Sequence, residues 1–203
     1  MSRAAPAPAP TPAPVPSALR FHATAALAAK LGGFTTVAHG PGHASEPGEP
    51  MALDTWYAHL IRRRKPQVMV MNTTTLMTVI VPLAPAATFF NRLPAYIAAQ
   101  LDGLRIPHDF IHAHVDRIAS AGAVLKTADR TMVGILNYRI GVLDYLNPLT
   151  EDDWLDAAFH FTDTLTLAVE EPHHGLDRLF GVVNDWEDRQ FNPPAKALTG
   201  DGP

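Results

Sequence analysis

Three neighbouring runs of mostly apolar residues cover residues 56–61, 67–72 and 76–81, and in the first run Trp56, Ala58 and Leu60 share one face by the two-residue period of a strand. Because these short runs lie between chain breakers, they predict three β-strands. In the second run both faces are apolar, because valines alternate with methionines at residues 68–71. We therefore expect this strand in the interior of the sheet. The short connections between the runs favour antiparallel hairpins.

Apolar residues spaced three and four apart predict helices in other parts of the chain. The longest stripe runs from Phe90 to Leu104, and Pro107 separates it from a shorter stripe. A helical stripe that starts at Leu155 is expected to continue until Pro172. The helical ranges are 25–31, 90–104, 111–118, 131–143, 155–169 and 176–186, and further strands are expected at 19–23 and 123–127.

These elements predict an α+β fold with a small, antiparallel-rich sheet of four to five strands, flanked by four to five helices. We expect a single domain at residues 19–191, with the strand at 123–127 as the fourth partner of the hairpin strands. Alternating proline and small residues predict a disordered, Ala/Pro-rich leader at residues 1–18. Residues 38–50 are expected to form a loop, and residues 192–203 a flexible tail.

Cysteine is absent from all 203 residues, which excludes disulfide bonds, thiolate zinc sites and cysteine nucleophiles. The first residues lack the apolar core of a signal peptide, and no apolar run has the length needed to cross a membrane. We therefore expect a cytoplasmic protein that does not partner a membrane.

The net charge of −4 conceals an asymmetry along the chain. Residues 1–149 hold 13 Lys or Arg against 8 Asp or Glu, whereas residues 150–191 hold 2 against 11. The favoured explanation is an acidic C-terminal layer that packs on a mildly basic body. The alternative is a basic face that binds an anion or a nucleic acid.

Polar residues at the expected strand ends form the first candidate site. Asp129 and Arg130 stand just before a predicted helix, where Asp129 can cap free helix amides and Arg130 can reach a carboxylate. The same pair could line a small polar site together with Asn72, Thr75 and Asn137. We favour the structural role and keep the polar site as the alternative.

A dense basic cluster forms the second candidate. Arg62, Arg63, Arg64 and Lys65 stand in a predicted hairpin connection, where they could neutralise phosphates. No aromatic residue stands inside the cluster to stack on bases. A solvated turn, or a strand edge protected by charge, is therefore favoured over nucleic-acid binding.

No motif in the chain predicts a metal, a cofactor or a nucleophile. His108, His112 and Asp116 share one helical face, but no glutamate follows His108 as in a metalloprotease helix, and a further ligand of definite spacing is missing. No serine stands in a Gly-x-Ser-x-Gly elbow, and the glycine pairs lack the context of a phosphate loop. We assign no catalytic residue and expect no cofactor, and the question of enzymatic activity stays open.

A succession of motifs over residues 19–147 resembles one protein family. The motifs are Arg20-Phe-His-Ala-Thr, Trp56-x-Ala-His-Leu, Gln67-Val-Met-Val-Met-Asn-x-x-Thr75 and Lys126-Thr-x-Asp-Arg-Thr-x-x-Gly-x-Leu-Asn137. Together they are similar to the bacterial family called Domain of Unknown Function 6933. The resemblance implies a small cytoplasmic α+β protein and supplies no agreed activity or catalytic residue. The chain departs from the family in its leader, in the loop at 38–50, and in Tyr138, where an acid is usual after the Asn137 position.

Two hypotheses of function follow. The favoured one is a non-enzymatic binding or regulatory module that works through a protein partner or, less favoured, a nucleic acid. The alternative is a small-ligand-binding protein or enzyme, with its polar site at the strand ends. A pocket that unites the five side chains of that site would support the alternative.

Overall fold

The computed structural model describes residues 20–34, 53–118, 123–146, 151–166 and 173–191. The predicted leader at 1–18, tail at 192–203 and loop at 38–50 lie outside these ranges. No helix within the ranges has both the length and the apolar character needed to cross a membrane.

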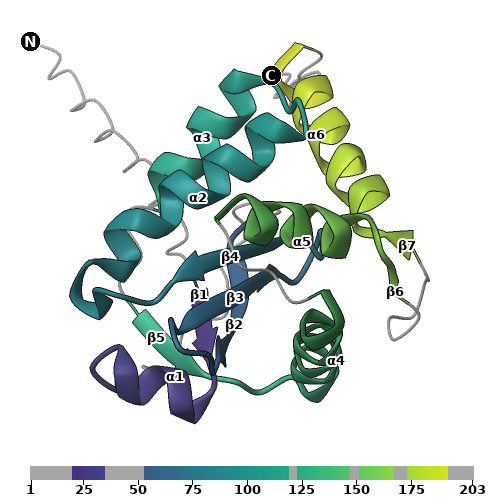
Figure 1. Ribbon diagram of the computed structural model, residues 1–203. Helices are drawn as coiled ribbons and strands as arrows, with labels where there is room; N and C mark the ends of the chain where they lie inside the picture. Colours follow the sequence, from purple (N-terminus) through teal and green to yellow (C-terminus); the bar gives the residue numbers. More distant parts are fainter. Residues whose placement is uncertain (1–19, 35–52, 119–122, 147–150, 167–172, 192–203) are drawn as a thin grey trace, which may run out of the picture.

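The domain is α+β and contains a five-stranded mixed sheet (Figure 1). Its strands are β1 (Arg20–Ala23), β2 (Thr55–Ile61), β3 (Gln67–Asn72), β4 (Thr78–Pro82) and β5 (Ala123–Lys126). They lie in the order β4-β3-β2-β1-β5. The predicted meander is confirmed, since β2, β3 and β4 pair antiparallel, whereas β1 runs parallel to both β2 and β5.

Helices in the described ranges cover both faces of the sheet (Figure 1). They are α1 (Ala25–Lys30), α2 (Phe89–Gly103), α3 (His108–Ile118), α4 (Arg130–Leu146), α5 (Glu151–Asp163) and α6 (Gly175–Phe191), with a 3-10 turn η1 (Ala86–Thr88). Residues of α1, α2, α3 and α6 join the hydrophobic core on one face, and residues of α4 and α5 join the core on the other. The sheet is thus the middle layer of three.

Strand β3 is buried along its whole length, which confirms that it lies in the interior of the sheet. Val68 and Val70 belong to the first core, and Met69 and Met71 belong to the second. This division follows from the two-residue period of a strand, which sends neighbouring side chains to opposite faces. Strand β2, rather than β3, is the middle strand of the five.

Strand β5 does not lie beside the hairpin strands, so the prediction for residues 123–127 was wrong on this point. It pairs with β1, and β1 separates it from β2. Parallel pairing needs a long crossover connection: α1 lies in the connection between β1 and β2, and the connection between β1 and β5 also contains the hairpin strands, α2 and α3. The sequence periods identified each strand but not which strands would be neighbours.

The helix predicted to continue to Pro172 ends at Asp163. The chain then forms a short strand β6 (Leu165–Thr166), which pairs antiparallel with β7 (His173–His174). β-branched threonines are frequent around this point, at residues 162, 164 and 166, and such residues favour strand over helix. The apolar spacing alone therefore overestimated the length of the helix.

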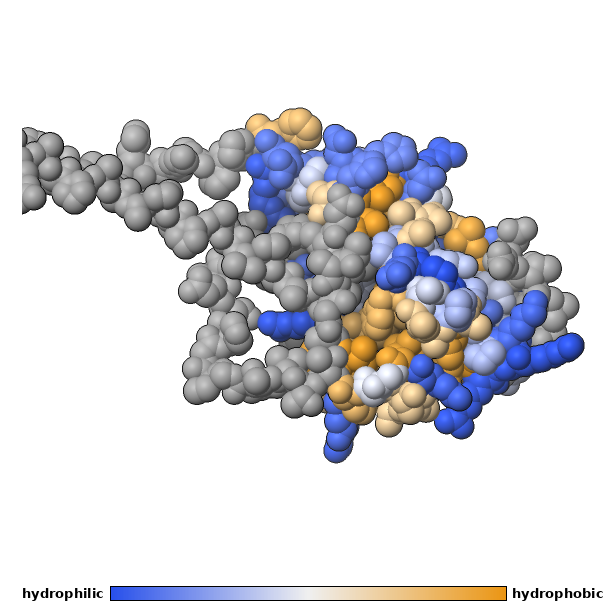
Figure 2. Space-filling view, turned by 90° about the vertical axis from the view of Figure 1, so that its left-hand side faces the viewer, coloured by the Kyte–Doolittle hydropathy of each residue, from blue (hydrophilic) through white to orange (hydrophobic). Residues whose placement is uncertain are grey.

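Some large hydrophobic side chains reach the surface of the domain. Figure 2 shows one face on which hydrophobic side chains appear between hydrophilic ones. Among the described residues Tyr138, Tyr145 and Phe191 are well exposed. Hydrophobic side chains exposed singly are normal on protein surfaces, so they do not define a site by themselves.

Candidate ligand pocket beside strand β4

Strand β4 forms one edge of the sheet, and helices α2 and α5 flank this edge from the two faces. The helices touch at one point, because a Cβ atom on Gly103 of α2 would collide with the ring of Phe159 of α5. Near the C-terminal end of β4, Arg92 of α2 donates a hydrogen bond from Nη2 to the Pro82 carbonyl at 3.0 Å. The edge is thus held between two helices.

A cavity of about 210 Å³ lies between these three elements. Its lining includes Ile80 and Pro82 from β4, Tyr96 and Gln100 from α2, Trp154 from α5, and Gln67 from β3. The remaining lining residues are apolar, and no lining residue carries a charge. An apolar concavity with a few polar groups is the usual character of a small-molecule site.

Two glutamines supply the unusual polar groups of this cavity. Gln100 is fully buried, and neither its Nε2 nor its Oε1 has a hydrogen-bond partner within the described residues. The Oε1 of Gln67 is also buried without a partner there. A buried amide that lacks a hydrogen bond costs about 1–3 kcal/mol, and native proteins seldom retain such groups without a reason.

No sequence motif singled out either glutamine. Gln67 shares a strand face with Met69 and Met71, and Gln100 follows Ile97 by three residues in the apolar stripe of α2. The signal that could have identified them was a polar amide at a position where the pattern of the strand or of the helix calls for an apolar residue. The third glutamine of the chain, Gln190, is exposed near the end of α6.

Two residues of the predicted polar site form the buried turn between β3 and β4. The Oδ1 of Asn72 accepts hydrogen bonds from the N–H groups of Thr74 at 3.0 Å and Thr75 at 2.9 Å, and from the Thr75 hydroxyl at 3.1 Å. Its Nδ2 donates to the Thr55 carbonyl at 3.1 Å. The amide of Asn72 is therefore occupied in holding the turn.

Asp129 caps helix α4. Its Oδ1 accepts hydrogen bonds from the N–H groups of Thr131 at 2.8 Å and Met132 at 3.2 Å. Its own N–H donates to the Tyr57 hydroxyl at 3.1 Å, which ties the start of α4 to strand β2. The capping role expected for Asp129 is confirmed.

Arg130 and Asn137, the remaining members of the predicted polar site, are both exposed on α4. Within the described part of the chain, hydrogen bonds join Asn72 to Thr75 and join neither of them to Asp129. None of the five residues lines the cavity beside β4.

The basic cluster is divided between the surface and the fold. Arg62, Arg64 and Lys65 are exposed, whereas Arg63 is half-buried. Arg63 donates from Nη2 to the Leu143 carbonyl at 2.9 Å, and its guanidinium carbon lies 5.5 Å from the centre of the Trp154 ring. Part of the cluster thus holds α4 and α5, and nucleic-acid binding by the others stays a prediction.

Arg139 of α4 is a buried cation that no sequence pattern had singled out. Its Nη1 donates to the Leu76 carbonyl at 3.0 Å and to the Thr78 hydroxyl, and its guanidinium carbon lies 5.9 Å from the centre of the Phe161 ring. Burial lowers the pKa of Arg139 to about 10. The side chain is therefore still charged at neutral pH, and it fastens α4 to the start of β4.

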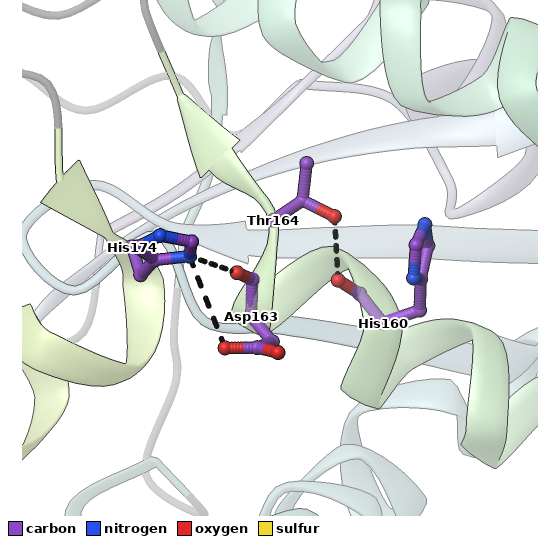
Figure 3. A network of polar contacts seen from close by, with 4 residues as sticks. All are labelled: His160, Asp163, Thr164 and His174. Carbon is purple, nitrogen blue, oxygen red and sulfur yellow. Dashed lines mark hydrogen bonds and ion pairs between the residues drawn. The ribbon is translucent and has the colours of Figure 1, made fainter.

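Four polar residues gather where α5 meets the β6–β7 pair (Figure 3). The Thr164 hydroxyl donates to the backbone carbonyl of His160 at 2.6 Å, and the imidazole of His174 contacts the backbone carbonyl of Asp163. The His160 ring points away from the other three side chains. Threonine, histidine and aspartate therefore do not form a nucleophile, base and acid in series, and the contacts close the end of the helix instead.

The histidines of α3 lie on the surface. His108 and His112 are exposed, and the side chain of Asp116 lies outside the described part of the structure. His108 Nε2 is 3.9 Å from Asp102 Oδ1. No group of three potential metal ligands comes together among the residues that the structure describes.

Comparison with known proteins gives one match. A family model described as "Domain of unknown function (DUF6933)" matches residues 20–173. No curated protein and no solved structure matched the chain. The family match covers more than half of the chain and includes all the residues that line the cavity beside β4. The chain therefore belongs to the DUF6933 family, as its motifs predicted.

Proposed function

We propose that this protein is a non-enzymatic binding module that takes a small neutral molecule in the cavity beside β4. The observation that carries the proposal is the pair Gln67 and Gln100, which bring buried amide atoms without partners to one cavity. A fold selected for stability alone would place apolar side chains at these two positions. Positions that break such local rules are most often functional.

The lining of the cavity favours binding over catalysis. It contains no aspartate, glutamate, histidine, lysine or serine, and Tyr96 is the one lining side chain with an ionisable group. Its amides can donate and accept hydrogen bonds without exchanging a proton. This composition supports the small-ligand-binding form of the alternative hypothesis, and we propose the cavity beside β4, rather than Asn72 and Asp129, as its ligand site.

The size and charge of the cavity restrict its ligand. At about 210 Å³ it is smaller than the roughly 300–1,000 Å³ of pockets for drug-sized ligands. No lining side chain would compensate an ionic group, and burying an unpaired charge is costly. The expected ligand is therefore small, neutral and mainly apolar.

A fragment screen tests this function. Wild-type protein, Gln100→Met and Gln190→Met would be exposed to a library of small neutral molecules and compared by ligand-observed NMR. Hits on the wild type and on Gln190→Met that are lost on Gln100→Met support the pocket. The absence of hits, or hits that survive Gln100→Met unchanged, would contradict it.

Protein and nucleic-acid partners stay predictions from the sequence. A nucleic-acid partner held by Arg62, Arg64 and Lys65 would bind with a steep salt dependence, because phosphate binding releases counterions. We also keep the proposal of a cytoplasmic location, which rests on the lack of cysteine.

A further inference from the structure

The backbone of β4 presents hydrogen-bonding groups to the edge of the sheet at alternate residues. The N–H of Asn72 in β3 donates to the carbonyl of Met77 at 3.0 Å, so this pair faces inward. Hydrogen-bonded and non-bonded pairs alternate along an antiparallel ladder. With the register Met71↔Thr78 and Met69↔Ile80, the N–H and C=O groups of Thr78 and Ile80 and the C=O of Pro82 point away from β3.

Two of these three positions are already occupied. The N–H of Thr78 donates to the Thr162 hydroxyl at 3.1 Å. Pro82 has no N–H, and its carbonyl accepts a hydrogen bond from Arg92 at 3.0 Å. Ile80 lies between them and lines the cavity, and no side chain or loop of the described ranges is hydrogen-bonded to its outward groups.

We propose that the outward N–H and C=O groups of Ile80 bind the cis-amide edge of a small lactam, a proposal that rests on the ligand-binding function of the cavity. In an extended residue these two groups point the same way, and a neighbouring strand would satisfy both of them with one residue of its own. A ring that contains –NH–C(=O)– presents the complementary donor and acceptor on adjacent atoms.

The rest of the cavity fits the body of such a ring. Pro82, Tyr96 and Trp154 supply apolar and aromatic surface, and no lining side chain is charged. A lactam is neutral and compact, and its polar atoms are confined to one edge. The ligand class therefore matches the edge strand, the uncharged lining and the volume of the cavity.

An extended peptide is a poorer occupant of the same edge. A peptide that added a strand beside β4 would need a row of free backbone groups along the edge. The N–H of Thr78 and the C=O of Pro82 are occupied, and α2 meets α5 where Gly103 approaches Phe159. The opening at Ile80 admits one amide rather than several.

Titration of the full chain with two matched probes tests the inference. The probes are 2-piperidone, which has the amide donor and acceptor, and cyclohexanone, a ring of the same size that keeps the acceptor and lacks the donor. Amide signals are followed by ¹⁵N–¹H correlation NMR, with Thr78 as the internal control because its outward N–H already has a partner. We expect the Ile80 proton to move downfield with 2-piperidone while Thr78 stays in place. The lactam should bind about tenfold more tightly than the ketone, the effect of one hydrogen bond to a buried carbonyl.

The outcomes separate the inference from the function on which it rests. Equal affinity for the two rings, or an Ile80 signal that does not respond, would overturn the role of Ile80. If other neutral fragments still move the side-chain amide of Gln100, the function of the cavity stands. If no fragment of any class binds, both proposals fail.

Discussion

Gln67 of β3 and Gln100 of α2 line one cavity, and each has a buried amide oxygen without a hydrogen-bond partner in the described structure. The two residues come from different layers of the fold, since β3 is in the sheet and α2 covers one of its faces. Their meeting at the edge of β4 leaves buried amide atoms without partners beside the cavity. Burying these amide atoms without hydrogen bonds should also lower the free energy of unfolding by a measurable amount.

We predict that, when both proteins are free of ligand, Gln100→Met is more stable than the wild type. Methionine has nearly the same shape and no amide to leave unpaired, so the free energy of unfolding should rise by about 1–2 kcal/mol. Urea denaturation followed by circular dichroism measures this change in the free energy of unfolding. Gln190→Met is the matched control, expected within about 0.5 kcal/mol of the wild type because Gln190 is exposed. A less stable Gln100→Met would mean that the amide already has partners.

Two glycines of α6 should respond to alanine in opposite directions. A Cβ atom at the buried Gly175 would collide with the backbone carbonyl of Thr162, which cannot rotate away. Gly175→Ala should therefore destabilise the protein by about 2 kcal/mol or more. Gly181 has open space around it, so Gly181→Ala should stabilise the helix by about 0.5–1 kcal/mol. Melting temperatures that shift the same way would contradict the packing of α6.

Asn72 and Asn137 test whether the residues predicted at the strand ends are structural. Asn72→Ala removes the acceptor of three hydrogen bonds in a buried turn and should cost about 2–3 kcal/mol of stability. Asn137→Ala changes an exposed residue of α4 and should be nearly neutral. Chemical denaturation of the two variants compares them. Similar effects of the two changes would show that the turn does not depend on Asn72.

Arg139 predicts a pH dependence with a definite sign. Burial lowers the pKa of its guanidinium to about 10 in the folded protein, below the pKa in the unfolded chain, so below pH 10 the group is charged in both states. Above pH 10 the folded state releases the proton first, and stability rises with pH while the unfolded state still holds it. The difference in unfolding free energy between wild type and Arg139→Met should therefore be constant from about pH 7 to 9 and then change in favour of the wild type. A difference that stays flat beyond pH 10 would exclude a lowered pKa.

The sequence predicted the strands and helices well where period and breakers agreed. Valines and methionines in β3 placed it in the interior, and Asp129 before an apolar stripe predicted the cap of α4. The position of β5 in the sheet could not be predicted from the sequence. The two-residue period of a strand is the same whether the strand joins a hairpin or pairs in parallel with β1. The end of α5 was predicted too late in the chain. The helical spacing of apolar residues continues past Asp163, whereas the threonines around that point favour a strand.

The candidate site depended on tertiary contacts that no motif records. Asn72 and Asp129 attracted attention because polar residues at strand ends often bind ligands, yet their atoms hold a turn and a helix start. Gln67 and Gln100 stand 33 positions apart in apolar patterns, and only the packing of α2 against β4 brings them together. A glutamine at a position where the pattern calls for an apolar residue is thus the only local sequence signal of the candidate site.

The side-chain amide of Gln100 gives the most direct test of the central claim. Its two protons and those of Gln190 can be followed together by ¹⁵N–¹H correlation NMR while the tightest fragment from the screen is added. Saturable shifts of the Gln100 signals, with the Gln190 signals unchanged, are the predicted result. Binding that leaves the Gln100 amide unmoved would place the ligand elsewhere and contradict the assignment of the cavity beside β4.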